Sequence, residues 1–483
     1  MTRSPSIESG GHERGPLLAL LVANMLEAFT SILVILSTPT ILHRFDEPLA
    51  SGGLLLTAYF LPYVALMPLW ARLGDAFGRR RVFLISLILY VLGSVVALAA
   101  LSFWWLIIGR IIQGLGNSAN EPLAVAIIGD LVAVERQGRA LGVWGTAGSI
   151  AASVSLVGGP LVDAIGWRSV FLLCVIFGLF TFFLVQRHLP SFPRTGDLGT
   201  VDWRGAATLT AGLVLVVTAI SKGNDWGWDS ASFLTLFFAG VLAVFAARLI
   251  KREGKEPFLD YSVFSYRILW FSSLAAAAAV FTLTGATITL PLYLNAVEQL
   301  NTSETGFILF INGTGLFLGA LAGGVATDRW RSRWPSVFGL SALGLSMFIM
   351  GAFTSDGVPL IVVAFTLVGF ATGMCFAPLS AVITKAFAAQ DLSAASGAFN
   401  LIRRTGTIMG AVAATSILDQ RIGILSSVYE RSLALAQSYR DTFWILGIVA
   451  IAAVFFAFRV CAETPLQASK VRQGHGGSNM AKR

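Results

Sequence analysis

RVFLISLILYVLGSVVALAAL, residues 81–101, carries a single charge, on Arg81, at its start. Because an α-helix rises 1.5 Å per residue, about twenty apolar residues cross the ~30 Å hydrocarbon core of a bilayer. Similar stretches lie near residues 17–41, 50–71, 104–129, 139–163, 167–188, 204–221, 231–250, 268–294, 305–327, 335–354, 358–386, 394–418 and 441–461. The sequence therefore predicts an all-α integral membrane protein with fourteen transmembrane helices.

The composition also indicates that most of the chain lies in a lipid bilayer. Of 483 residues, 55% are hydrophobic and only 12% charged, and the mean hydropathy is +0.76. Soluble domains are about 45–50% apolar and 25% charged, so a soluble core could not hide this much apolar surface. The net charge of +8 does not indicate nucleic-acid binding, because the basic residues lie in short loops between apolar stretches.

Enzyme and cofactor chemistry have little support in the sequence. The three cysteines lie inside apolar stretches without a C-x-x-C spacing, and the four histidines are far apart, so neither a disulfide framework nor a metal site is expected. The chain has no phosphate-binding G-x-x-x-x-G-K-[ST] motif, and no soluble insertion is large enough for a catalytic domain. We expect a protein that is not an enzyme and has no cofactor.

The basic residues also predict the orientation. The first apolar stretch is too long for a signal peptide and contains Glu27, so we expect a retained helix. One set of loops is rich in Lys and Arg, and these face the cytoplasm by the positive-inside rule. We expect a multi-pass protein of the cytoplasmic (inner) membrane with both termini in the cytoplasm. The cytoplasmic set comprises Arg72, Arg79, Arg80, Arg81, Arg136, Arg139, Arg187, Arg194, Lys251, Arg252, Lys255, Arg329, Arg331, Arg333 and the basic C-terminal tail.

The chain repeats itself at an offset of roughly 250 residues. Residues 72–79, after the second apolar stretch, are echoed by residues 324–330 after the tenth, and residues 116–122 are echoed by residues 373–378. This predicts two six-helix halves, 17–188 and 268–461, with two inserted helices in 189–267 and with tails at 1–16 and 462–483. Internal duplication is typical of transporters, whose halves rock about a central site.

The motifs resemble those of a known family. The segment 71–81, ARLGDAFGRRR, resembles the signature loop between helices 2 and 3 of the major facilitator superfamily, with Ala71 replacing its first Gly. Residues 110–116, RIIQGLG, resemble the R-x-x-Q-G-x-G motif of its drug:proton antiporters. Together with fourteen spans, the stretches at 226–228, 257–260 and 403–406 (Arg403, Arg404, Thr405, Gly406) resemble the multidrug-efflux branch. The resemblance implies a proton-coupled exporter of drugs or small organic molecules, with protons as the coupling ion.

The signature loop is a candidate gate. Its glycines allow two helices and a tight turn to approach closely, and an acid among arginines adds nothing to membrane topology. We expect this gating loop to help hold one conformation. Its candidate residues, with those of the echo in the second half, are Gly74, Asp75, Gly78, Arg79, Asp328 and Arg329.

Glu27 is the leading candidate for proton coupling. It lies about ten residues into the first stretch, roughly 15 Å deep, where a carboxylate is costly and burial favours its protonated form. The resembled family has an acid in this part of helix 1. Arg110 is the intramembrane cation of the first half, and its partner could be Glu27, Glu121 or backbone carbonyls. The resemblance assigns Arg110 a role in proton transfer or in fixing the conformation, and a structural ion pair is the alternative.

Three further polar residues of the fourth stretch are candidates for the substrate cavity. Glu121 and Asn120 precede Pro122, whose expected kink could expose the carboxylate to the cavity, although a position near the membrane surface would leave Glu121 merely solvated. Gln113 belongs to the fourth-helix motif. A separate set of glycines at helical spacing is expected to let helices pack closely, without direct chemistry: Gly158, Gly159, Gly315, Gly319, Gly323, Gly406 and Gly410.

One departure from the resembled family concerns helix 5. Where the antiporters have Gly-Pro-x-x-Gly-Gly, this chain has Val154-Ser155-Leu156-Val157-Gly158-Gly159. Losing Gly-Pro is expected to stiffen this helix and leaves the direction of transport open. A dedicated metabolite exporter or importer is therefore the alternative, and a transporter-derived sensor a less favoured one.

The expected partners are the lipid bilayer and a small organic substrate, and no nucleic acid. In a Gram-negative cell a periplasmic adaptor protein could join the transporter. A monomer is expected to suffice, and the sequence identifies neither the substrate nor the oligomeric state.

The first prediction concerns topology. Reporter domains fused at Arg14 and after Arg459 should both report the cytoplasm, because the basic loops favour that side and fourteen crossings return the chain to it. An external C-terminus would mean an odd number of crossings and would refute the prediction.

Overall fold

The computed structural model describes residues 14–49, 51–132, 140, 144, 147–192, 203–227, 229–249, 261–354, 357–387, 389–427 and 429–460. Within them the chain forms helices and their connections, so the all-α prediction is confirmed. Several predicted features lie outside the described residues: the two tails up to residue 13 and from residue 461, most of the loops at 133–143 and 193–202, Trp228, and the motif at 257–260.

The first half of the chain begins with three long helices. They are α1 (Arg14–Phe45), α2 (Ser51–Phe77) and α3 (Arg79–Leu98). The expected fourth and fifth spans are each interrupted, the fourth into α4 (Phe103–Asn117) and α5 (Asn120–Leu131), and the fifth into α7 (Ala147–Ala151), the 3₁₀ turn η1 (Ala152–Val154) and α8 (Ser155–Ile165). The half ends with α9 (Arg168–His188).

Two inserted helices and the second half follow. The inserted helices are α10 (Trp203–Trp226) and α11 (Ala231–Leu249), and a 3₁₀ turn, η3 (Tyr261–Ser265), leads into the second half. Its helices are α12 (Arg267–Ala296), α13 (Thr302–Trp330), α14 (Arg333–Ala352), α15 (Val358–Ala386), α16 (Ala389–Leu425) and α17 (Arg431–Val460). Within the described residues, each of the fourteen expected stretches thus contains helix, and the fourth and fifth are interrupted.

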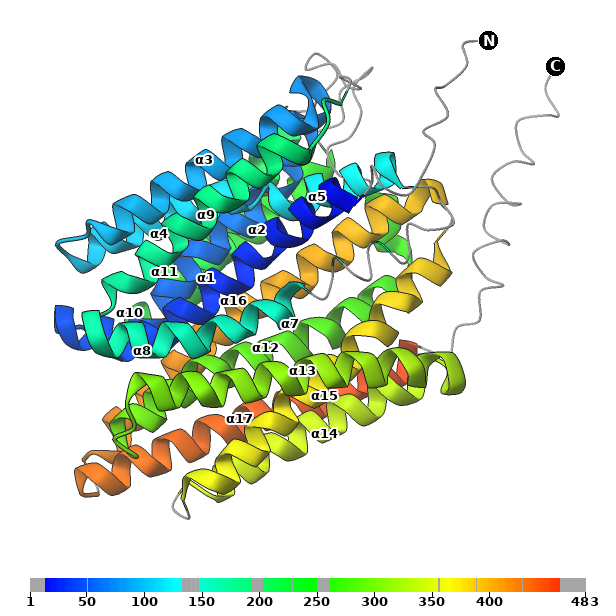
Figure 1. Cartoon of the computed structure of the whole chain (residues 1–483). Helices are drawn as coiled ribbons and strands as arrows, with labels where there is room; N and C mark the ends of the chain where they lie inside the picture. The colour runs from blue at the N-terminus through cyan, green and yellow to red at the C-terminus, as the bar shows by residue number, and fades with distance from the viewer. Residues whose placement is uncertain are drawn as a thin grey trace, which may run out of the picture.

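The described helices run along one bundle, in which α1–α9 gather on one side and α12–α17 on the other (Figure 1). Nine of them are long and apolar enough to cross a membrane, or ten if α2, which bends by 51° near its middle, is counted as one span. Large apolar side chains are exposed around the outside, among them Phe183, Phe338 and Ile448, as lipid-facing surface requires. The number of crossings remains a prediction.

Glycines set how closely the helices approach. In α13, Gly315 and Gly323 face the carbonyl oxygens of Thr366 and Met374 on α15, each 2.5 Å from the position that an added Cβ would take. Gly319, between them, faces the carbonyl of Phe370 in the same way. Any side chain at these positions would therefore push α13 and α15 apart.

The two halves meet tightly at the end of the bundle where α8 ends and α13 begins. Asp163 of α8 accepts hydrogen bonds from the backbone N–H groups of Thr302 (3.1 Å) and Ser303 (2.8 Å), and from the Ser303 hydroxyl. These two N–H groups lie in the first turn of α13 and have no partner within the helix. An added Cβ at Gly159 would lie 2.7 Å from the Thr302 carbonyl, so the backbones nearly touch.

A second contact closes the same end. Gly52 and Gly53, at the start of α2, lie against the side chain of Thr415 near the end of α16. Since α2 and α8 belong to the first half and α13 and α16 to the second, the halves are held together here on two sides. We call this the closed end, and the end that carries residues 72–81 and 329–333 the basic end.

The second prediction tests the closed end. Replacing Asp163 with Ala removes three hydrogen bonds between the halves and should open this end more often. In a Cys461→Ser background, a cysteine placed at the buried Thr305 of α13 should then react with a water-soluble maleimide about tenfold faster. Asp163→Asn, which keeps one acceptor oxygen, should give an intermediate rate, and an unchanged rate in Asp163→Ala would show that this contact does not hold the end closed.

Candidate functional site

A pair of opposite charges joins the halves in the middle of the bundle. Glu27 of α1 accepts two parallel hydrogen bonds from Arg404 of α16, one from Nη1 to Oε1 and one of 2.6 Å from Nη2 to Oε2. Glu27 lies thirteen residues after the start of α1, about 20 Å along the helix. Both side chains are nearly enclosed, with 14% and 13% of their surfaces exposed. A bidentate pair of this kind fixes distance and direction together.

Two more charged residues complete the cluster. Arg404 Nη2 also donates to Glu121 Oε2 at 3.2 Å, and Arg403 Nη2 lies 3.8 Å from Glu121 Oε1. Arg403 donates mainly to Asn400 Oδ1, at 2.9 and 3.2 Å. The formal charges of two glutamates and two arginines cancel, which is how buried ions are tolerated in a low-dielectric interior. We call Glu27, Glu121, Arg403 and Arg404 the charge cluster.

The position of Glu121 depends on a break in the fourth span. A single helix over 104–129 was the expectation, but α4 ends at Asn117 and α5 begins at Asn120. Pro122 explains the break, because it has no N–H to donate to the Ser118 carbonyl and its ring clashes with that group. Glu121 therefore lies in the first turn of a helix that begins mid-bundle, where free N–H groups favour a negative charge. Transporters often place such half-helix ends at their substrate and ion sites.

Tyr63 of α2 connects the cluster to the interior of the first half. Its hydroxyl donates to Glu27 Oε2 at 3.4 Å, and its ring centre is 5.4 Å from the Arg404 guanidinium. The ring also stacks on Tyr59, with 5.9 Å between the centres. Tyr63 thus gives the Glu27 carboxylate a third hydrogen-bond donor besides the two of Arg404.

Arg110 lies beyond Tyr59 and does not pair with either glutamate. Its Nε donates to the Leu55 carbonyl at 3.0 Å, its Nη1 donates to Gln113 Oε1 at 3.0 Å, and its guanidinium lies 4.5 Å from the centre of the Tyr59 ring. The sequence left Glu27, Glu121 and backbone carbonyls open as partners of Arg110, and the structure pairs Arg110 with a backbone carbonyl, that of Leu55. Arg110 is fully buried, and its Nη2 has no hydrogen-bond partner among the described residues.

The two other cavity candidates differ in position. Gln113 is fully buried between Arg110 and Ser94, to whose hydroxyl it donates at 2.8 Å, so it faces the inside of the first half and not the charge cluster. Asn120 lies beside Glu121 and donates to the Ala23 carbonyl of α1 at 2.5 Å. Its buried Oδ1 has no partner among the described residues, which leaves one acceptor near the cluster.

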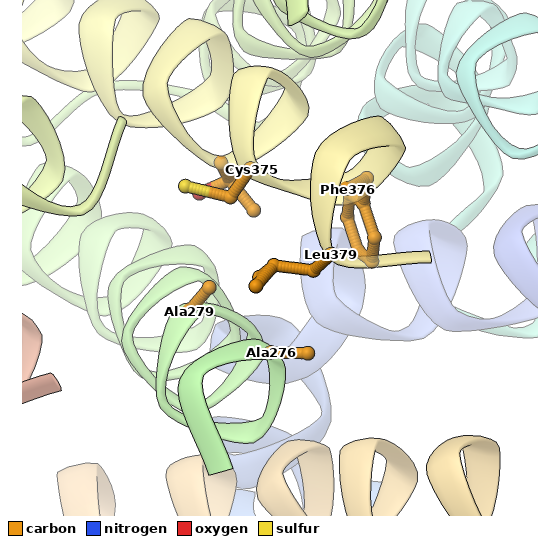
Figure 2. Close-up of a pocket in the computed structure, with 6 residues that line it drawn as sticks. Ala276, Ala279, Cys375, Phe376 and Leu379 are labelled. Atoms are coloured by element: carbon orange, nitrogen blue, oxygen red, sulfur yellow. The ribbon is translucent and has the colours of Figure 1, made fainter. Parts of the chain in front are cut away.

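An apolar gap lies beside the cluster, between α12 and α15 (Figure 2). Arg403 stands 5.4 Å from the centre of the Phe376 ring, which borders the gap. The gap leaves no room for a water molecule, and its lining residues are Ala276, Ala279, Thr372, Cys375, Phe376 and Leu379. A mostly apolar contact between α12 and α15 thus lies next to a buried positive charge. Among the described residues no cluster of His, Cys, Asp or Glu could hold a metal ion.

The signature segment is mostly helical. The sequence suggested a loop over 72–81, but α2 continues to Phe77 and α3 begins at Arg79, so Gly78 alone makes the turn, with φ of 95°. Charged residues can extend a helix beyond the hydrocarbon core because its surroundings there are polar. Gly74 packs against Leu123 of α5, where a Cβ would collide.

The turn is held by an ion-pair network at the basic end. Arg79 donates from Nη2 to Asp75 at 3.0 Å, from Nη1 to Asp130 of α5, and from Nη1 to the Ala126 carbonyl at 3.1 Å. This network ties the α2–α3 turn to the end of α5. In the echo within the second half, Arg329 is exposed at the end of α13, and the side chain of Asp328 lies outside the described residues.

Helix 5 also differs from the expectation. Loss of Gly-Pro predicted a stiffer helix, yet the 3₁₀ turn η1 interrupts the helix over residues 152–154, directly at the altered element. Close packing explains it, since Ala152 faces Gly313 of α13 and the Ser155 carbonyl faces Gly306. A 3₁₀ turn within a helix often marks a hinge. Stiffness is therefore no argument about the direction of transport.

The remaining packing glycines lie at contacts between helices. Gly158 faces Leu33 of α1, and Gly406 and Gly410 of α16 face the carbonyl oxygens of Ala277 and Phe281 on α12. An added Cβ would collide at each of these three positions.

Four residues of the site are not among the candidates that the sequence gives. Arg403 and Arg404 stand there only in a family motif, and Tyr63 and Asp130 in no motif. Two adjacent arginines in the apolar stretch 394–418 were a usable signal, because intramembrane cations need counter-charges and the first half supplies two glutamates. Nothing in the sequence alone marks Asp130 as the partner of Arg79.

A helical bundle of two halves with paired charges at its centre defines a class of membrane transporters. Comparisons with known proteins identify the family: the model of the Major Facilitator Superfamily matches residues 20–313 and 269–479. The chain belongs to the Major Facilitator Superfamily. It is therefore a multi-pass membrane transporter of small substrates and not an enzyme.

Individual relatives agree with this assignment. The chain is 29% identical to the MFS-type transporter Rv1250 of Mycobacterium tuberculosis, over 84% of this chain and 70% of the relative. It is 27% identical to Multidrug resistance protein 3 of Bacillus subtilis, over 73% and 69%. The crystal structure of a D-xylose–proton symporter shares the fold, with a TM-score of 0.66 and 14% identity, over 94% of this chain and 100% of that one.

The third prediction tests the gate. Asp75→Asn removes the charge that Asp75 contributes to Arg79 but keeps the size of the side chain, so the protein should insert normally and transport about tenfold more slowly. Flux in proteoliposomes measures it, with Asp229→Asn, outside this network, as the matched control. Wild-type flux in purified Asp75→Asn would remove the gating role from Asp75.

Proposed function

We propose that this protein is a proton-coupled secondary transporter that exports drugs or other small organic molecules across the cytoplasmic membrane by alternating access. The observation that carries the proposal is the Glu27–Arg404–Glu121 arrangement, which joins the halves in the middle of the bundle. The similarity of the chain to Multidrug resistance protein 3 supports drugs as the substrate class. The basic loops support cytoplasmic termini.

The charge cluster suggests how protons could drive the cycle. In the described conformation Arg404 neutralises Glu27, and the halves meet at the closed end. A proton on Glu27 would remove the charge that holds Arg404 and leave that arginine to Glu121 alone. Protonation would thereby loosen a contact between α1 and α16 that lies between the halves. Such a contact can couple the loading of one proton to the rocking of the two halves.

The surroundings of the cluster fit an organic substrate. Phe376 and the small side chains packed between α12 and α15 are apolar and lie next to the charges (Figure 2), where a change of conformation could expose them to a substrate. Tyr63 adds an aromatic face and a hydroxyl on the opposite half. Sites for small molecules typically combine apolar walls with a few polar groups.

A dedicated metabolite exporter or importer of the same family is the second candidate. The helix 5 sequence differs from the Gly-Pro element of the resembled antiporters, and because η1 interrupts this helix, its stiffness does not favour export over import. Flux measured in both directions, with each sign of proton gradient, distinguishes the two, and a transporter-derived sensor would show no flux. One chain contains the whole charge cluster, so we propose that a monomer suffices for transport. In a Gram-negative host we propose a periplasmic adaptor protein as a further partner.

The fourth prediction concerns Glu27. Glu27→Gln keeps size and hydrogen bonding but cannot titrate, so it should abolish uphill transport driven by a proton gradient and leave downhill exchange. Glu27→Asp, which keeps the charge on a shorter arm, should retain part of the coupled flux. The measurement is substrate accumulation in proteoliposomes under an imposed proton gradient.

A double variant separates coupling from structure. Glu27→Gln leaves Arg404 short of one counter-charge and should lower the melting temperature, whereas Glu27→Gln with Arg404→Gln removes both charges and should recover it. Neither variant should regain coupled transport. If Glu27→Gln still concentrates substrate when only a proton gradient is supplied, Glu27 is structural and Glu121 becomes the next candidate.

A further inference from the structure

The arginines at the basic end of the two halves are satisfied in different ways. In the first half, Arg79 is bound by Asp75 and Asp130, and Arg80 donates to the Gln186 carbonyl at 2.6 Å. The matching turn of the second half connects α13 to α14, and Arg333 is the first residue of α14. No carboxylate among the described residues pairs with Arg333, and its buried Nε, like that of Arg80, has no hydrogen-bond partner there.

Arg333 is instead held by aromatic rings. Its guanidinium lies 3.6 Å from the centre of the Phe458 ring on α17 and 5.5 Å from the centre of the Trp334 ring. Arg459, next to Phe458, lies 5.2 Å from the centre of the Phe455 ring and likewise has no ion-pair partner within the described residues. Stacking on rings orients an arginine but leaves the N–H groups at its edge free to donate.

The surface around these arginines is apolar and exposed. Trp334 and Phe338 on α14, and Phe455 on α17, each have more than half of their surface exposed. Tryptophan and arginine together at a helix end are typical of the headgroup level of a bilayer, and the phenylalanines continue toward the hydrocarbon. The face between α14 and α17 therefore presents two positive charges that no carboxylate of the described residues pairs, above an apolar strip.

We propose that this face, formed by Arg333, Trp334, Phe338, Phe455 and Arg459, binds an anionic phospholipid. The lipid phosphate accepts hydrogen bonds from the two Nη groups of Arg333, whose Nε is buried, and from the exposed Arg459, a geometry that the guanidinium fork suits. One acyl chain lies along Phe338 and Phe455. The two positive charges favour a headgroup with net negative charge over a zwitterionic one, as basic pockets between transmembrane helices do.

The proposed site should retain anionic and zwitterionic lipids to different extents. Delipidated protein is titrated with phosphatidylglycerol or phosphatidylethanolamine, and lipid retention is followed by native mass spectrometry. Wild type should retain phosphatidylglycerol in preference, and Arg333→Gln with Arg459→Gln should weaken that retention about tenfold. Arg333→Lys, which keeps the charge but loses the fork of donors, should fall between them.

The matched control removes the same charge from the same end of the bundle. Arg187 and Arg267 are exposed at the end of α9 and the start of α12, so Arg187→Gln with Arg267→Gln should leave retention unchanged. An equal loss in this control would reduce the effect to general attraction and overturn the site. Equal retention of phosphatidylethanolamine by wild type would overturn the preference for anionic lipid. Displacement of the lipid by excess inorganic phosphate would make the site one for a soluble anion.

If the double glutamine variant fails to fold, Arg459→Gln alone serves, because Arg459 is exposed at the end of α17 and its removal leaves Arg333 in place. It should lower the retention of phosphatidylglycerol relative to the control pair. Unchanged retention would exclude Arg459 from the site and overturn the proposal as stated. These measurements require no transport, so their outcome is independent of the proposed function.

Discussion

A carboxylate in the middle of a membrane bundle must be neutralised, and the pairing of Glu27 with Arg404 satisfies that constraint across the boundary between the halves. The two residues are 377 positions apart, so neither half can satisfy its own charge at this point. Glu121 and Arg403 complete the balance. A proton on Glu27 would therefore change an interaction between the two halves. Coupling an ion to a rocking motion requires such an interaction.

Rigidity and mobility are distributed unevenly around this centre. Glycine contacts such as Gly319 against Phe370 bring backbones together within each half, where helices should move as one body. Two irregular segments of the first half are the α4–α5 break at residues 118–119 and the 3₁₀ turn η1. Both lie on spans that contact the second half, beside Glu121 and opposite Gly313 respectively. Some of the contacts between the halves are thus made where regular helix is lost.

The sequence predicted the helices well because the bilayer imposes a strong one-dimensional rule. Without water, backbone groups must bond within the helix, so each span is readable as a long apolar stretch. The same rule identified Glu27 and Glu121, since a charge in such a stretch is conspicuous. It failed for the signature segment, where α2 runs to Phe77, because charge marks the end of the hydrocarbon core and not the end of a helix.

By itself, then, the sequence determined the all-helical membrane fold and the depth of Glu27 and Glu121 along their spans. Tertiary structure alone decided their partners: Glu27 pairs with Arg404 and not with Arg110, and Arg79 binds Asp130. The physical reason is that apolar periodicity fixes how deep a residue lies along its own helix, whereas pairing depends on how helices turn and pack on each other. That packing follows from glycine contacts between segments far apart in the chain, which no local pattern encodes.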